Sequence, residues 1–163
     1  LKSAEGRFQL VRSKDSVTGI IDYAHTDDAL KNLLKTINNI RNVNEELIVV
    51  FGCGGERDKS KRLLMTEVAC DLSSQVILTS DNPRGESLDS IISDMTDGLD
   101  PLQKEKILII SDRKQAINTA ARLAKSKDII VLAGKGHETY QEINGNKIPF
   151  NDKNELKKAL KII

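Results

Sequence analysis

The stretch Asp81-Asn82-Pro83-Arg84 brings together a carboxylate, an amide, a fixed turn and a guanidinium within four residues. It follows an apolar run at 76–78 that predicts a buried strand. Pro83 fixes its own φ and biases Asn82 away from helix, so the carboxylate and the guanidinium are held in a defined relation. An anion beside a cation suits a zwitterionic ligand. Exposed Asn-Pro turns have the same composition, and this segment alone leaves that alternative open.

Two glycine-rich loops follow other apolar runs. The loop at 52–58 partly resembles a dinucleotide-binding fingerprint, but Arg57 stands where the third glycine belongs. We therefore favour glycines that let the backbone turn and bring Arg57 inward, and a dinucleotide site is the weaker alternative. In the loop at 134–138, Gly136 follows Lys135 where a phosphate-binding loop has Ser or Thr, so no phosphate-cleaving loop is predicted there.

Three other residues could do chemistry but lack partners. His25 and His137 each follow a predicted strand, and no motif places a Ser or Cys nucleophile beside either, so a hydrogen bond that fixes a loop is the simpler role. Cys53 lies in a glycine-rich loop without a neighbouring base, so an activated thiolate is the weaker interpretation. No catalytic residue is assigned.

Composition bounds the class of protein. The chain has 163 residues, 39% hydrophobic and 30% charged, with a net charge of +1. This predicts one globular domain over 1–163 and gives no electrostatic reason to expect nucleic acid or a membrane as a partner. With two Cys far apart and two His, we expect free thiols and no metal site. No signal peptide is indicated, so a cytoplasmic location is expected. The first residue is Leu1 and the segment looks internal, which suggests a piece of a longer protein.

Strand, loop and helix patterns then alternate along the chain, and each must place one of these loops. The expected strands are 8–11, 17–21, 47–51, 76–78, 107–110 and 129–133. Helices are expected after Thr26, through 64–72, from Ser87 to Leu99, and after Asp112, with apolar residues at helical spacing that include Ile40 and Leu64. Asn144-Gly145 predicts a hairpin turn, and Asp152 with Glu155 resembles a capping box that starts the last helix.

This order predicts an α/β fold: a doubly wound, mostly parallel, Rossmann-like sheet with helices on both faces, a small C-terminal hairpin and a final helix. Loops at the carboxyl ends of parallel strands emerge at one edge of the sheet, where ligands bind in such folds. We therefore expect the loops after Phe51, Leu78 and Ala133 to converge.

Four motifs in this order resemble the C-terminal domain of the Mur ligases, specifically the UDP-N-acetylmuramoyl-tripeptide synthetase branch. They are 22–26 (Asp-Tyr-Ala-His-Thr), 51–59 (Phe-Gly-Cys-Gly-Gly-Glu-Arg-Asp-Lys), 81–84 (Asp-Asn-Pro-Arg) and 133–138 (Ala-Gly-Lys-Gly-His-Glu). In that family the Asp-Asn-Pro-Arg form marks enzymes that add meso-diaminopimelate. Asp27 and Leu63 stand where prolines are usual, and because Asp suits a helix start, the first change should leave the fold intact.

The resemblance implies an ATP-dependent amide ligase of peptidoglycan biosynthesis, in which ATP phosphorylates a D-Glu carboxylate and the diaminopimelate amine attacks it. Arg84 and Gly134 would hold the distal carboxylate of the amino acid, and Asn82 and Glu138 its distal ammonium. Asp81 would belong to the same pocket, and Arg57 would bind the carboxylate at the reacting end. Two zwitterionic ends require both anion and cation binders, and Arg offers a bidentate fork to a carboxylate.

For the nucleotide, the resemblance implies that Asp22 contacts the ribose and Arg7 the phosphates. Separately, a glycine followed by an arginine at the start of the domain, Gly6-Arg7, predicts a hinge about which the domain rotates as a rigid body. The family's phosphate loop, magnesium ligands and UDP-sugar domain are not found in the sequence, so ATP and Mg²⁺ are expected to bind mainly outside it and no cofactor is expected in it. Small-molecule substrates and a monomer are expected. The alternatives are the C-terminal domain of a lysine-adding or folylpolyglutamate-type ligase, or a free-standing ligand-binding α/β module.

Overall fold

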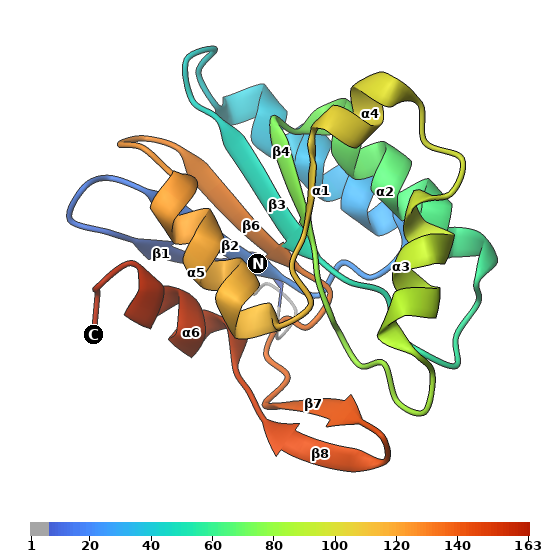
Figure 1. Cartoon of the computed structure of the whole chain (residues 1–163). Helices are drawn as coiled ribbons and strands as arrows, with labels where there is room; N and C mark the ends of the chain where they lie inside the picture. Colours follow the sequence, from blue (N-terminus) through green and yellow to red (C-terminus); the bar gives the residue numbers. More distant parts are fainter. Residues whose placement is uncertain (1–6) are drawn as a thin grey trace.

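The computed structural model describes residues 7–163, which form a six-stranded sheet and a separate two-stranded hairpin (Figure 1). The sheet order is β1-β2-β6-β3-β4-β5, and all neighbours are parallel except β1 with β2. The strands are β1 (Gln9–Arg12), β2 (Thr18–Asp22), β3 (Leu47–Phe51), β4 (Gln75–Leu78), β5 (Ile107–Ile109) and β6 (Ile129–Ala133). The predicted doubly wound α/β fold is confirmed.

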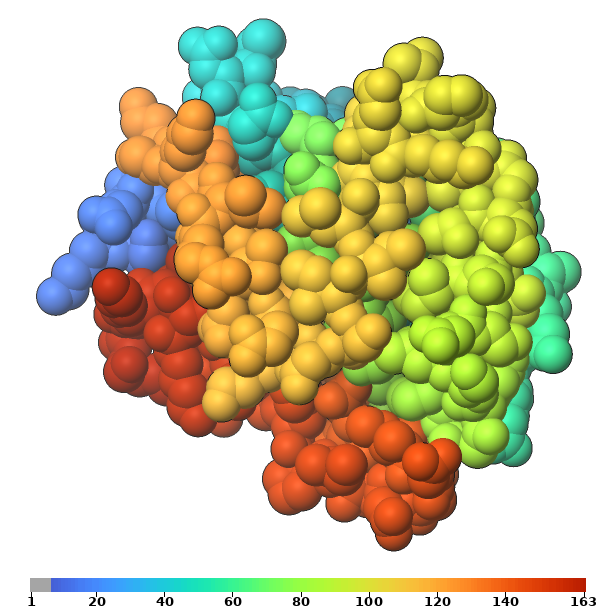
Figure 2. Space-filling view, viewed as in Figure 1, coloured from blue at the N-terminus to red at the C-terminus, as the bar shows by residue number. Residues whose placement is uncertain are grey.

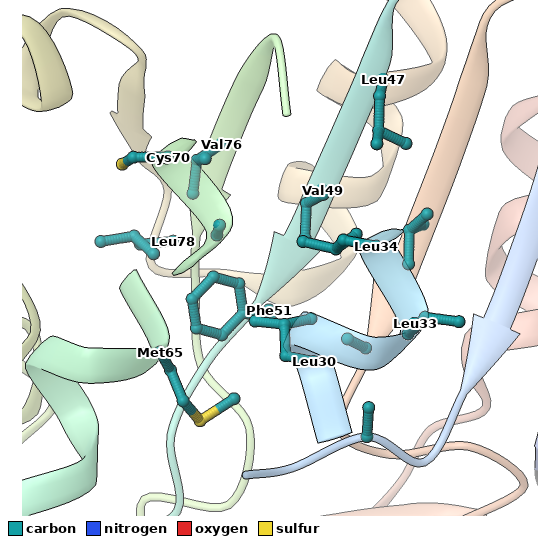
Figure 3. Close-up of a cluster of buried hydrophobic side chains, with 14 of the residues drawn as sticks. Leu30, Leu33, Leu34, Leu47, Val49, Phe51, Met65, Cys70, Val76 and Leu78 are labelled. Carbon is teal, nitrogen blue, oxygen red and sulfur yellow. The ribbon is translucent and has the colours of Figure 1, made fainter. Parts of the chain in front are cut away.

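Helices cover both faces of this sheet. They are α1 (Asp27–Ile40), α2 (Ser60–Leu72), α3 (Leu88–Thr96), α4 (Pro101–Glu105), α5 (Arg113–Leu123) and α6 (Asp152–Ala159). All five side chains of β3 are buried, and alternate residues point to opposite cores. Val49 and Phe51 join the core beneath α1, α2 and α3, whereas Ile48 and Val50 join the core beneath α5 and α6. Figure 3 shows Phe51 in the first core beside Leu30 of α1.

Local capping explains where several helices begin. The Thr26 hydroxyl accepts from Ala29 N, and the Asp112 carboxylate accepts from Gln115 N, as their predicted cap roles require. Asp27 starts α1, which confirms that this departure from the usual proline leaves the helix intact. Ser87 occupies the N-cap position of α3 without a side-chain hydrogen bond.

Several sequence expectations about element ends and exposed residues were wrong. The last helix is capped by Asn151, whose side chain accepts from Asn154 N, because the carboxylate of Asp152 is fully buried against Arg113 instead. Leu99 lies beyond the end of α3, and the short α4, which has its own capping box at Asp100, was not predicted.

Exposure also departs from the apolar patterns at three places. Leu64 is 43% exposed on α2, and Ile40 is 70% exposed at the end of α1, where no element covers it. Strand β5 lies at the edge of the sheet and pairs only with β4, so Leu108 and Ile109 remain partly exposed.

The hairpin consists of β7 (Tyr140–Ile143) and β8 (Asn146–Pro149), joined at Asn144-Gly145 as predicted. Both turn residues have positive φ, which Asn and Gly tolerate. Figure 2 shows the hairpin projecting from one end of the molecule as a lobe of its own. Within residues 7–163, no helix is long and apolar enough to cross a membrane.

Candidate functional site

Three loops meet at the carboxyl ends of β3, β4 and β6, as expected for neighbouring parallel strands. They line one cavity of about 300 Å³. All six residues predicted to bind the amino acid are among its lining residues: Arg57, Asp81, Asn82, Arg84, Gly134 and Glu138. The tertiary structure therefore gathers side chains that are up to 81 positions apart, from Arg57 to Glu138, around one space.

The glycine-rich loop after β3 lies directly on the loop after β4. Gly55 N donates to Asn82 O at 2.8 Å. A Cβ on Gly55 would lie 1.8 Å from Pro83 O, and one on Gly52 would lie 2.2 Å from Thr79 O. These glycines are required for the close approach of two backbones, since any side chain would separate the loops.

Arg57, which this loop was expected to bring inward, lines the cavity at its exposed rim. Its Nη1 donates to Glu56 O at 3.2 Å. An exposed guanidinium with one backbone partner retains most of its donors for an anionic ligand.

Arg62 of α2 fixes the same loop from behind, a role that sequence reasoning missed. Its side chain is 1% exposed; Nη2 donates to Gly54 O at 2.9 Å, and Nη1 donates to Glu86 Oε1 at 2.8 Å and Asp94 Oδ2 at 2.9 Å. Glu86 also accepts from Glu56 N at 2.9 Å. Arg62 Nη2 also donates to Glu86 Oε2 at 2.8 Å, so Arg62 contacts both carboxylate oxygens. The hydrogen bonds from Arg62, followed by the one from Glu56 N, lower the pKa of Glu86 to about 2.

Asp81 and Asn82 are buried at the end of β4 around the ammonium of Lys135. Lys135 Nζ lies 3.2 Å from Asp81 Oδ1, 2.8 Å from Asn82 Oδ1 and 3.3 Å from Glu138 Oε1, and its side chain is 0% exposed. The Asn82 oxygen also accepts from Glu142 N at 3.0 Å. Two donors at this oxygen fix the orientation of the amide and leave its NH₂ group without a protein partner in the described chain.

Arg84 is held by both its backbone and its guanidinium. Its φ is +54°, an uncommon conformation for a residue other than glycine. Arg84 N donates to Glu142 O, and Asn144 N donates to Arg84 O, so β7 adds an isolated parallel bridge to this loop. Nη1 donates to Gly55 O at 2.8 Å, and Nε lies 3.6 Å from Glu142 Oε2.

The hairpin therefore supports the binding loop. Gln141 is buried, and its Nε2 donates to Ser80 Oγ at 3.0 Å and to Asp81 O at 2.8 Å. With the backbone contacts of Glu142 and Asn144, strand β7 reaches the loop at Ser80, Asp81, Asn82 and Arg84 in turn.

A second support lies under the loops, on the side of α5 and α6. The side chains of Arg113 and Asp152 are both 0% exposed and form a bidentate pair at 2.8 and 2.7 Å. Arg113 also donates to Ser80 O at 3.0 Å and Ala133 O at 3.3 Å. These carbonyls directly precede Asp81 and Gly134, so one guanidinium sets the spacing of the two strand ends.

Gly134 has a φ of +108°, and a Cβ there would lie 3.2 Å from Asp81 Oδ2. Its N–H donates to Asp22 O at 3.1 Å and is therefore not available to a ligand. The contribution of Gly134 to the cavity is the space beside Asp81 that the missing side chain leaves.

Arg7 and Asp22, the two predicted nucleotide contacts, line a different cavity of about 350 Å³ beside α1. Asp22 accepts from Phe8 N and Ala24 N, both at 2.8 Å, one at each carboxylate oxygen. Gly6 of the predicted hinge lies outside the described residues.

His25 Nδ1 donates to Tyr23 O at 3.0 Å, and the imidazole packs edge-on against the Tyr23 ring, in agreement with a role in fixing the loop. Burial, followed by the carboxylates of Glu138 and Asp81, raises the pKa of Tyr23.

Both cysteines are free thiols, as expected, and both are buried. Burial raises the pKa of Cys53 to about 12, which argues against an activated thiolate. Residues 7–163 contain no group of three or more His, Cys, Asp or Glu side chains placed to hold a metal.

Sequence reasoning missed the residues that act from behind the cavity: Arg62, Gln141, Arg113 and Lys135. Lys135 was visible inside a glycine-rich loop, but a lysine at such a position is ordinarily solvated. The other three lie on a helix, a hairpin and a helix start, where polar residues are common. Nothing in their local spacing distinguishes them from surface residues.

Comparison with known proteins agrees with this geometry. The family described as Mur ligase, glutamate ligase domain matches residues 6–136. The chain is 49% identical over 160 residues to a UDP-N-acetylmuramoyl-L-alanyl-D-glutamate--2,6-diaminopimelate ligase of Cytophaga hutchinsonii, covering 98% of this chain and 33% of that protein. It is 52% identical over 157 residues to the protein of the same name from Parabacteroides distasonis, covering 96% and 32%.

A solved structure of a protein of that name superposes with a TM-score of 0.89 at 46% identity, covering 99% of this chain and 32% of the other. A bifunctional folylpolyglutamate synthase/dihydrofolate synthase with Mn, AMPPNP and L-glutamate bound shares the fold alone, with a TM-score of 0.60 at 20% identity over 81% of this chain and 29% of that one. The chain spans about a third of the length of the curated relatives it matches. From the family match over most of its length, the chain belongs to the Mur ligase, glutamate ligase domain family.

Proposed function

We propose that this chain is the amino-acid-binding domain of an ATP-dependent ligase that adds meso-2,6-diaminopimelate to UDP-N-acetylmuramoyl-L-Ala-D-Glu in peptidoglycan biosynthesis. The observation that carries the proposal is the cavity that the Arg84 guanidinium lines together with the carboxylates of Asp81 and Glu138. A cation binder next to an anion binder fits the zwitterionic far end of diaminopimelate, whereas the far end of lysine has no carboxylate. The similarity to proteins of that name supports the same ligand.

Free donors and acceptors suggest the role of each side chain. Arg84 uses Nη1 for Gly55 O and keeps other donors for the distal carboxylate. Asp81 and Glu138 each have one oxygen near Lys135, and we assign their remaining lone pairs to the distal ammonium.

Asn82 receives a revised role. It was expected to hold the ammonium, but its oxygen already accepts from Lys135 and Glu142, so we propose that its NH₂ group donates to the carboxylate beside Arg84. Arg57, at the rim, would bind the carboxylate of the reacting end. Gly134 would contribute room beside Asp81 and not its N–H.

For ATP and Mg²⁺, the described residues fit one edge of a nucleotide and not a whole one. Among the described residues that line the cavity at Asp22, Arg7 is the only arginine or lysine, whereas a triphosphate with its metal needs several cationic or backbone donors. We infer that ATP and Mg²⁺, like the UDP-sugar, bind mainly to other domains of a longer cytoplasmic protein. The 163-residue chain by itself, a single domain and a monomer, should then neither hydrolyse ATP nor form the amide.

A titration monitored by NMR tests the ligand, because it detects millimolar binding and maps it onto residues. Unlabelled meso-diaminopimelate is added to the ¹⁵N-labelled chain, with L-lysine and L-glutamate in parallel. We expect shifts at the loops of Asp81 and Gly134, saturating at a lower concentration with diaminopimelate than with either other amino acid.

Each alternative has its own outcome. Tighter binding of L-lysine would favour a lysine-adding ligase, and tighter binding of L-glutamate a folylpolyglutamate-type ligase. No shift in these loops with any amino acid would contradict the proposal and favour a module with a different ligand.

A further inference from the structure

The ammonium of Lys135 is the innermost charge of the site. Its side chain is fully buried, and Nζ contacts one oxygen each of Asp81, Asn82 and Glu138 at 2.8 to 3.3 Å. A buried ammonium is strongly unfavourable unless it is paired and hydrogen-bonded, so this lysine depends on these oxygens as they depend on it. The proposed function gives it no ligand to contact.

The charges around this ammonium nearly balance. Two carboxylates, Asp81 and Glu138, line the cavity together with the Arg84 guanidinium, and Lys135 Nζ lies behind them, 3.2 Å from Asp81 Oδ1 and 3.3 Å from Glu138 Oε1. Glu142 adds an anion 3.6 Å from Arg84 Nε, but its side chain is 30% exposed, so water screens it.

The other charged residues that line the cavity are either exposed to solvent or already paired. Arg57, Asp58 and Lys61 are exposed, so water screens them, and Arg62 is paired with Glu86 and Asp94.

A cavity with balanced charge suits a ligand end that is itself neutral overall. The far end of meso-diaminopimelate carries one carboxylate and one ammonium, whereas the far end of lysine carries an ammonium alone. Without the charge of Lys135, the two negative charges of Asp81 and Glu138 would be opposed by Arg84 alone. This inner part of the site would then be net negative and would suit a bare ammonium better.

We propose that Lys135 is a second specificity-determining residue: a buried counter-ion that makes the cavity select an amino acid with a zwitterionic far end over one with a bare ammonium. It acts through Asp81, Asn82 and Glu138, so it is a positioning residue. The inference rests on the proposed function and adds to it a residue that influences ligand specificity without contacting the ligand.

Removing this charge should change the preference between ligands and not only the affinity. Lys135→Met keeps the length of the side chain without the charge, and Lys135→Gln keeps a hydrogen-bond donor without the charge. Dissociation constants for meso-diaminopimelate and L-lysine are measured by NMR titration of the 163-residue chain. The preference for diaminopimelate should fall at least about 10-fold in both variants, equivalent to ~1.4 kcal/mol.

Lys147→Met is the matched control. Lys147 Nζ lies 4.7 Å from the centroid of the Tyr140 ring, and Lys135 Nζ lies 6.0 Å from the same centroid. The ammonium of Lys147 makes no hydrogen bond or ion pair with Asp81, Asn82 or Glu138 in the described residues. Its loss should leave the preference unchanged. A second comparison restores the balance: Lys135→Met with Glu138→Gln removes one charge of each sign, and the preference should move back towards that of the unmodified chain.

The remaining outcomes overturn the inference. A merely structural role of Lys135 would weaken both ligands alike and leave their ratio unchanged, and full recovery in Lys135→Gln would show that a donor suffices without charge. Collapse of the NMR dispersion in both single variants would also assign a structural role. If the unmodified chain shows no preference for diaminopimelate, the proposed function itself fails, which its own titration reveals before any variant is compared.

Discussion

At the scale of residues, the ligand roles depend on which hydrogen-bond donors and acceptors have no partner within the protein. The side-chain oxygen of Asn82 already accepts from Lys135 and Glu142, and both carboxylate oxygens of Asp22 accept from backbone N–H groups. Arg84 and Arg57 keep donors that face the cavity. The unpaired donors and acceptors therefore indicate ligand roles that residue type alone does not.

Arg84→Ala should cause the largest single loss of affinity for meso-diaminopimelate. A desolvated carboxylate that loses its charged partner costs about 2 to 5 kcal/mol, roughly a 30-fold to several-thousand-fold weaker binding. Arg84→Lys should recover only part, because an ammonium keeps the charge and loses the fork. The NMR titration measures both, and L-lysine binding to Arg84→Ala should stay within a few fold. Diaminopimelate binding equal to that of the unmodified chain would remove Arg84 from the site.

Glu86 makes the anchor of the glycine-rich loop sensitive to acid. Its pKa is lowered from 4.5 to about 2, chiefly by the hydrogen bonds from Arg62. A depressed carboxyl pKa stabilises the folded state fully above the unfolded value, and this stabilisation is lost as the pH falls through the folded value. Glu86→Gln should therefore be less stable than the unmodified chain at about pH 7, with the gap shrinking by about pH 3. Urea unfolding of both proteins at the two pH values measures this gap, and a constant gap would contradict the assignment.

At the scale of elements, the site is formed where two loops and a hairpin pack against one another. The loop after β3 packs closely against the loop after β4 because glycines lie at the contact. The hairpin contacts the loop after β4 at four residues of that loop. Helix α2 fixes the first loop through Arg62.

Gly55→Ala tests the contact between the two loops. The new Cβ would lie 1.8 Å from Pro83 O, a backbone atom that cannot move without breaking the bond from Gly55 N to Asn82 O. We expect a loss of about 2 to 3 kcal/mol in the free energy of unfolding and a displaced Asp81 loop. Gly85→Ala is the matched control. Its nearest atom is the flexible Glu56 Oε1 at 3.4 Å, so it should change stability by no more than about 0.5 kcal/mol. Equal effects of the two changes in urea unfolding would refute close contact at Gly55.

At the scale of the whole molecule, the two faces of the sheet have different tasks. The core under α1, α2 and α3 carries the glycine-rich loop, whereas the face covered by α5 and α6 holds the strand ends through Arg113 and Asp152. The last helix is thus coupled to the site although none of its residues lines the cavity.

Asp152→Ala should destabilise the chain by about 3 to 5 kcal/mol, because it leaves the buried guanidinium of Arg113 without its counter-ion. The double variant Arg113→Met with Asp152→Leu replaces the pair by apolar groups and should be clearly more stable than Asp152→Ala. It should still bind the amino acid less tightly, since Ser80 O and Ala133 O lose their common donor. Urea unfolding and the NMR titration separate the two effects. A double variant no more stable than the single one would show that the charge pair is not what Asp152 contributes.

The sequence by itself determined the alternation of strands and helices and the position of each motif at a strand end. These features depend on residues close together in the chain: the continuous apolar run of β3, the Thr26 and Asp112 caps and the Asn144-Gly145 turn. The convergence of three loops followed from the parallel pattern, and the order of motifs carried the resemblance.

Only the tertiary structure decided which polar groups satisfy one another. Lys135 reaches Asn82 across 53 positions, and Arg113 reaches Asp152 across 39, and no local pattern encodes such pairs. The same reason explains the wrong expectation for the last helix: Asp152 is a good local cap, but the buried Arg113 claims its carboxylate and Asn151 takes the cap. Leu64 and Ile40 follow a helical period, but their exposure depends on whether another element covers them. Local propensity fixes the elements, whereas burial and pairing exist only after distant segments have been brought together.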